Sequence, residues 1–118
     1  MNPQNLDPLA IVLPPTIWAV KPIDEQPELT LTDWAIFEVK MALSPVRTRH
    51  FAGYNVTDRE GRASSAIVEF DPATLRGVTE SGRVYQLQGP PGLEGDGQHV
   101  WNSWLRLAKA TDVAEVQL

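Results

Sequence analysis

The stretch DWAIFEVKMALS, residues 33–44, decides the fold that we expect for this chain. Its residues alternate in two sets, one of which is entirely apolar: Ala35, Phe37, Val39, Met41 and Leu43. Successive side chains of a β-strand point to opposite faces, so this period of two predicts a long strand with one apolar face. A helix is the competing interpretation, because alanine, methionine, glutamate and lysine are good helix formers. The unbroken alternation and the stop at Ser44-Pro45 favour the strand.

Further strands follow this stretch, separated by sequences typical of turns. We expect them at 48–56, 64–70, 77–80 and 83–88. The intervening sequences DREG (58–61), DPAT (71–74) and SG (81–82) suit tight turns, in which aspartate caps the backbone and glycine supplies a positive φ. Residues 33–88 therefore predict an antiparallel β-meander of about five to six strands.

A single helix is predicted at 97–110, with Asp96 as its N-cap. Four apolar residues lie at spacings i, i+3, i+4 and i+7, namely Trp101, Trp104, Leu105 and Ala108. This spacing predicts an amphipathic helix that packs on the sheet. Residues 113–118 are a candidate last strand. The expected fold class is α+β: one domain, with a β-meander packed by one C-terminal amphipathic helix.

The N-terminal part reads differently. Residues 1–8 predict a flexible tail, and the prolines within 9–28 restrict that segment to an extended arm or an edge strand. Trp34 and Ile36 lie on the otherwise polar face of their strand, which implies cover by the helix, by this arm or by another subunit. We therefore expect a homodimer. The predicted core comprises Phe37, Val39, Met41, Phe51, Val68, Phe70, Tyr85, Leu87, Trp101, Trp104 and Leu105.

Composition excludes several classes of protein. The chain has no cysteine, so disulfides, thiolate metal sites and cysteine nucleophiles are absent. The net charge of −5 argues against general DNA binding and suits a basic partner. No apolar run reaches the roughly 18–20 residues of a membrane span, and the lack of a signal peptide favours the cytoplasm. His50 and His99 lack further ligands at metal-site spacing, so we expect no metal and no cofactor.

Two groups of residues are candidates for binding. Turns of a meander alternate between its two ends, so Arg59, Arg62 and Arg83 are expected at the same end, where they can hold an anion or a partner. The alternative is a set of solvated turns, since neighbouring acidic residues can neutralise the arginines.

The second group joins Arg49 with Tyr54 and Tyr85, an arginine–aromatic combination that stacks bases in single-strand nucleic-acid modules. The glycine-containing motif of those modules is missing, which argues against nucleic acid. A Ser–His–Asp set can be written from Ser64 or Ser65 with His50 and Asp71, but no G-x-S-x-G motif accompanies it.

The middle of the chain also carries a resemblance. The matching residues are SSAI (64–67), FDP (70–72), SGRVYQLQGPPG (81–92) and Trp101, about a third of the chain. In these residues the chain resembles a family of small, uncharacterised bacterial proteins encoded by accessory or mobile-element genes. The resemblance implies a shared meander and no known chemistry.

Three functional hypotheses follow. The first is a non-enzymatic accessory protein that acts by protein–protein interaction or self-association, for instance an inhibitor of a defence system of the anti-restriction or anti-CRISPR type. The second is a small-anion or small-ligand pocket, binding or enzymatic, between helix and sheet, lined by Trp34, Tyr54, Tyr85 and Trp101 with Arg49 or Arg83 orienting an anion. The third is single-stranded nucleic-acid binding.

Overall fold

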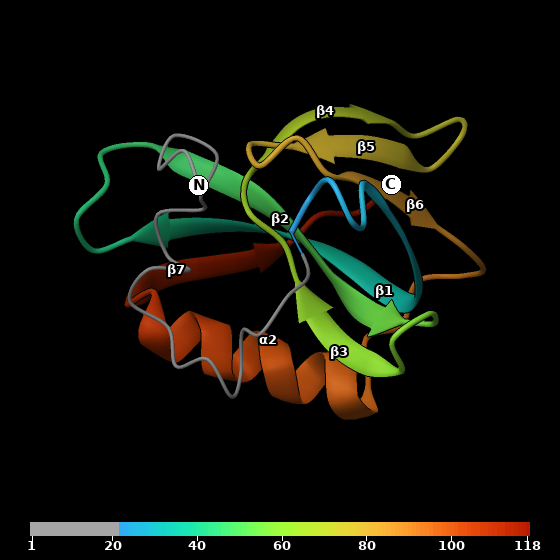
Figure 1. The fold of residues 1–118 in the computed structure, drawn as a ribbon. Helices are drawn as coiled ribbons and strands as arrows, with labels where there is room; N and C mark the ends of the chain where they lie inside the picture. Colours follow the sequence, from blue (N-terminus) through green and yellow to red (C-terminus); the bar gives the residue numbers. More distant parts are fainter. Residues whose placement is uncertain (1–21) are drawn as a thin grey trace.

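The computed structural model describes residues 22–118, which form seven strands and one helix (Figure 1). The strands are β1 (Glu28–Met41), β2 (Arg47–Asn55), β3 (Glu60–Ala63), β4 (Ile67–Asp71), β5 (Arg76–Thr79), β6 (Val84–Leu87) and β7 (Ala110–Glu115). The helix is α2 (Gly95–Leu107). The α+β class is therefore shown. The expected tail at 1–8 and the arm up to residue 21 lie outside the described residues.

The decisive stretch is a strand, as its alternation predicts, but it is buried on both faces. A β-bulge between Thr32 and Ala35 shifts the phase of β1, and Asp33 takes a φ of 46° there. Leu31 faces the barrel interior before the bulge, and Trp34 and Ile36 face it afterwards. Trp34 and Ile36 were expected to be covered by the helix, by the arm or by another subunit; each is 3% exposed, but within the barrel core. The chain's own sheet covers them.

The sheet is mixed, whereas a purely antiparallel sheet was expected. Neighbouring strands pair antiparallel except β1 and β6, which pair parallel. The reason is topological: β3 and β4 are one pass of the chain, so the meander makes five passes, and its first and last passes run in the same direction. When the sheet curls and these two strands meet, they must pair parallel.

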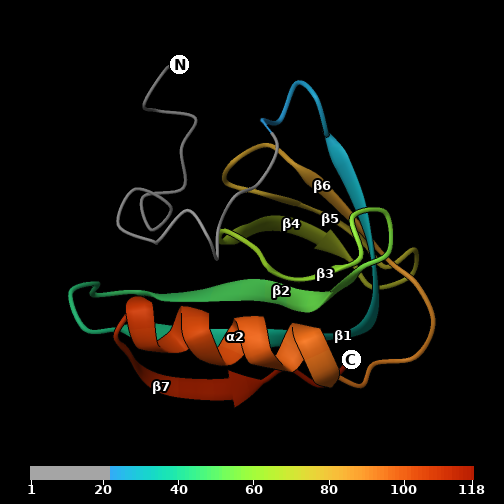
Figure 2. The ribbon, with the colours of Figure 1, turned by 60° about the horizontal axis from the view of Figure 1, so that its bottom comes forward.

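Residues 64–66 join the two edges of the curled sheet. Ser64 N donates to Phe51 O of β2 at 2.9 Å, and Glu80 N, just beyond β5, donates to Ala66 O at 2.8 Å. The segment from β3 to β4 thus bonds to β2 at one end and to the β5 hairpin at the other. The sheet therefore closes on itself as a small barrel, with β4–β6 folded over β1 and β2 (Figure 2).

Helix α2 and strand β7 complete the molecule outside the barrel. Beyond the end of β6, β1 pairs with β7 in its place, from Phe37 to Met41. Helix α2 packs on β3 and β2, on the opposite side of the sheet from β4–β6 (Figure 2). The N-cap is Glu94, whereas Asp96 was expected. Asp96 lies in the first turn, where its negative charge complements the helix dipole.

Two cores result, one on each side of β2. The helix-side core contains Val39, Ala52, Ala63, Trp101, Trp104 and Ala108. The barrel core contains Leu29, Leu31, Trp34, Ile36, Phe51, Tyr85 and Leu87. The prediction that Val68 is a core residue was wrong, because the bulge between Ile67 and Glu69 leaves its side chain 66% exposed.

Gly61 serves packing, whereas a positive φ was expected of it. The positive φ of this turn belongs to Arg59, at 58°. A Cβ on Gly61 would lie 2.1 Å from the carbonyl oxygen of Asp96, so glycine is required for α2 to approach β3. At the other expected turn, Gly82 does take a positive φ, of 89°.

Within residues 22–118, no helix is long and apolar enough to cross a membrane.

Candidate functional site

Three of the candidate binding residues converge at one end of the barrel. Arg62 Nε donates to the hydroxyl of Tyr85 at 3.2 Å. Arg83 Nε donates to the backbone oxygen of Gln26, just before β1, at 2.9 Å. The convergence follows from the alternation of turns, but both arginines lie inside the fold, with 6% and 4% of their surfaces exposed.

The charged groups of this cluster, among them the Arg83 guanidinium and the Asp58 carboxylate, form hydrogen bonds within the fold. Burial lowers the pKa of the Arg83 guanidinium, and the Arg62 guanidinium lowers it further, while Tyr85 and Asp58 raise it. The Asp58 carboxylate accepts from Gln26 Nε2 at 3.0 Å and from Asn55 Nδ2 at 3.1 Å. The network therefore ties the segment before β1 to the β2–β3 turn and to β6.

The remaining candidates lie apart from this cluster. Arg49 is exposed near the start of β2, and its Nε lies 3.2 Å from Glu38 Oε1. Tyr54 is half-buried on β2. Trp34 is in the barrel core and donates from Nε1 to Gly89 O at 2.9 Å. Trp101 belongs to the helix-side core, so the sheet separates it from Trp34 and Tyr85.

His50 is a buried structural residue. Its Nδ1 lies 2.9 Å from the backbone oxygen of Ser64, and its Nε2 lies 2.7 Å from the hydroxyl of Thr48. Burial lowers its pKa to about 4, so the ring is neutral at pH 7. The Ser64 hydroxyl donates to Ser65 O, and Asp71 caps its own turn, so the Ser–His–Asp set is not assembled.

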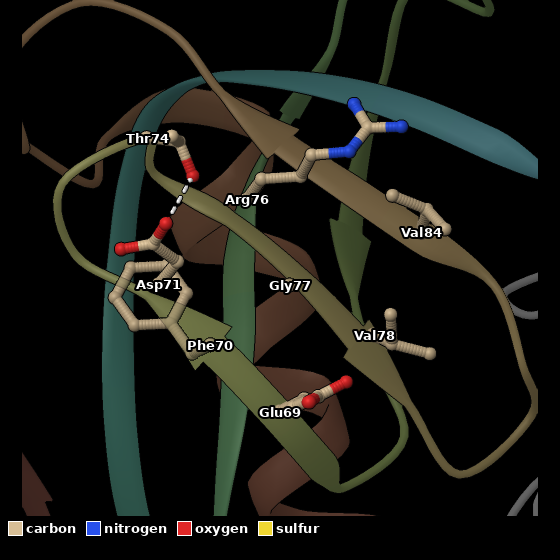
Figure 3. Close-up of a pocket in the computed structure, with 8 residues that line it drawn as sticks. All are labelled: Glu69, Phe70, Asp71, Thr74, Arg76, Gly77, Val78 and Val84. Atoms are coloured by element: carbon tan, nitrogen blue, oxygen red, sulfur yellow. Dashed lines mark hydrogen bonds between the residues drawn. The ribbon is translucent and has the colours of Figure 1, made fainter.

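The described surface has a hollow on the outer face of β4, β5 and β6 (Figure 3). Its volume is about 330 Å³. The side chains of Val78 and Val84 lie next to each other on its floor, beside the backbone of Gly77 (Figure 3). The other lining residues are Glu69, Phe70, Asp71, Thr74 and Arg76.

The charged residues around this apolar floor differ in whether they have partners among the described residues. Arg76 is occupied by Glu28, with Nη2 2.5 Å from Oε1, and by a hydrogen bond to Gln86 at 3.3 Å. The Asp71 carboxylate accepts from Ala73 N at 2.9 Å and from the Thr74 hydroxyl at 3.1 Å. Glu69 forms no hydrogen bond or ion pair with any described residue, and it is exposed. Its carboxylate is the group of the hollow available to a cation.

The surface formed by residues 22–118 exposes fewer basic side chains than the sequence suggests. Residues 22–118 contain fourteen aspartates and glutamates and nine lysines and arginines. Two of these nine, Arg62 and Arg83, are buried, so seven basic residues face fourteen acidic ones.

The hollow was not among the predicted sites. A signal was present, because Val84 alternates with Tyr85 and Leu87 and so must point away from the core. Because Val68 was assigned to the core, we did not expect an exposed valine on β4.

No family model, curated protein or solved structure matches the chain. Among the described residues, no group of three or more histidine, aspartate or glutamate side chains is placed to hold a metal ion.

Proposed function

We propose that this protein is a non-enzymatic binding protein that engages a basic segment of another protein through the hollow on β4–β6. The observation that carries this proposal is the Glu69 carboxylate beside a floor of valines. The two features together fit one class of group, a cationic side chain with an aliphatic stem.

A lysine or arginine of the partner satisfies both features at once. Its methylene stem lies on Val78 and Val84 while its charged end reaches Glu69, as long cationic side chains do on mixed surfaces. Each exposed ion pair contributes less than about 1 kcal/mol. Affinity therefore rests on the apolar contact, and the charge supplies orientation and selectivity.

Long-range electrostatics supports the same class of partner. The excess of acidic side chains on the surface attracts a basic protein and raises the rate of encounter. It repels nucleic-acid backbones, which weighs against single-strand binding.

The resemblance at residues 64–67, 70–72, 81–92 and Trp101 supports a biological setting for this activity. It favours a bacterial accessory protein encoded by a mobile element. A small acidic protein that captures a basic host protein suits an inhibitor of a restriction or CRISPR defence system. The small-ligand alternative has less support, since its lining residues are divided between the two cores.

The test uses isotope-labelled protein titrated with short synthetic peptides of three kinds: lysine and arginine flanked by valine or leucine, the same with glutamate, and the same with serine. The basic peptides are expected to shift backbone resonances of β4, β5 and β6, and Glu69→Lys to abolish the shifts. Glu60→Lys is the matched control, because Glu60 is an exposed strand glutamate on β3 outside the hollow. Shifts elsewhere only, or shifts that survive Glu69→Lys, would refute the proposal.

A further inference from the structure

A second candidate surface is the outer edge of β7. Strand β7 pairs with β1 along one side, and no strand of residues 22–118 pairs with it along the other. Residues 111–115 are all exposed, including Val113 at 40%. Figure 2 shows β7 at the margin of the sheet. Such an edge presents unpaired N–H and C=O groups to any strand that can align with it.

The hydrogen bonds to β1 show which backbone groups of β7 point outward. Val116 N donates to Ile36 O at 2.8 Å, so the groups of Val116 point toward β1. Because these directions alternate along an antiparallel strand, Ala114 and Asp112 also point toward β1. The N–H and C=O of Val113 and Glu115 therefore point outward.

Symmetry then limits how β7 can pair with itself. In an antiparallel pair, a residue whose N–H and C=O point toward the partner strand must lie opposite another such residue. In a symmetric pair, one residue of β7 therefore lies directly opposite its own copy, and the twofold axis runs between these two copies. An axis at Asp112 places two carboxylates directly opposite each other, which is destabilising. Axes at Val113 and at Ala114 both place Asp112 and Glu115 opposite uncharged residues, but only the axis at Val113 sets two β-branched apolar side chains against each other. The axis at Val113 places Asp112 opposite Ala114 and Glu115 opposite Thr111.

We propose that β7 pairs antiparallel with β7 of a second copy of this chain, with Val113 on the twofold axis. Both acidic residues of the strand then lie opposite uncharged ones, and Asp112 keeps its ion pair with Arg47. Strand β7 contains no proline or lysine, the residues that commonly block an exposed edge. The sheets of the two copies become continuous, with both α2 helices on the same face.

This proposal rests on β7 alone and does not depend on the hollow. It is tested first by measuring the mass of the protein with light scattering over a range of concentrations. The wild type is expected to be a dimer and Val113→Lys a monomer, because that substitution sets two ammonium groups against each other. Val68→Lys is the matched control, an exposed valine on β4 whose replacement is expected to leave the dimer intact.

A cysteine variant gives an independent readout, since the chain has no cysteine of its own. Directly opposed hydrogen-bonded residues have Cα atoms about 5.5 Å apart, within the range that a disulfide spans. Val113→Cys is therefore expected to cross-link rapidly under mild oxidation, and Val68→Cys slowly. A wild type that is monomeric at every concentration, or a dimer that survives in a folded Val113→Lys variant, would overturn the proposal.

Discussion

Acidification is expected to weaken this fold through one side chain, His50. The imidazole is 2% exposed and packs against Trp104, with ring centroids 4.6 Å apart. Since the backbone oxygen of Ser64 can only accept, Nδ1 carries the proton and Nε2 accepts from Thr48. A second proton on Nε2 would reverse the bond with Thr48, whose hydroxyl would then accept, and would place a charge in the helix-side core.

The magnitude follows from the two pKa values of His50. Its pKa is about 4 in the folded protein, against 6.5 in the unfolded chain. The folded value is lowered, so the unfolded chain binds the extra proton first. The stabilisation is complete above pH 6.5 and is lost as the pH falls toward 4. The full loss is about 3 kcal/mol, of which about 2 kcal/mol falls between pH 7 and pH 5.

The assay is urea unfolding followed by tryptophan fluorescence at pH 7 and pH 5, with the wild type and His50→Gln compared. The free energy of unfolding of the wild type is expected to fall by about 2 kcal/mol between these pH values, and that of the variant much less. His99→Gln is the matched histidine-to-glutamine control, since His99 is exposed on α2. Equal pH dependence in wild type and His50→Gln would refute the assignment.

Three further substitutions test the packing, each by urea or thermal unfolding. Gly61→Ala is expected to cost about 1–3 kcal/mol or more, because its Cβ would meet the carbonyl of Asp96. Gly53→Ala, whose Cβ would lie 3.1 Å from the backbone oxygen of Thr32, should cost less, and equal losses would contradict this. Trp34→Phe leaves the Gly89 carbonyl without its donor, a loss of about 1–2 kcal/mol, and an unchanged midpoint would argue against that bond. Tyr85→Phe removes the acceptor of a buried guanidinium, at about 1.5–3 kcal/mol; a smaller effect would mean that water replaces the hydroxyl.

Much of the candidate cluster was within reach of sequence reasoning. Turn alternation in a meander is enough to bring Arg62 and Arg83 to one end, whereas Tyr85, which accepts from Arg62, was grouped with Arg49 and Tyr54. Turn alternation does not predict that the two arginine side chains are buried. Burial depends on where the segment before β1 lies, and Gln26 closes over Arg83 from 57 residues away in sequence. A pair of arginines expected at the surface is internal for that reason.

The sequence alone determined most local elements, although β3 (Glu60–Ala63) was missed, because it overlaps the turn predicted at 58–61 and precedes the strand predicted at 64–70. Alternation in 33–44 and 48–56 produces strands, and the spacing of Trp101 and Trp104 produces a helix, because these periods are properties of neighbouring residues. Only the tertiary structure decided which faces are covered. The bulge at Asp33, the closure of five passes into a barrel and the second bulge beside Val68 depend on pairing between distant segments. That pairing buried Trp34 and exposed Val68, and no local period carries information about it.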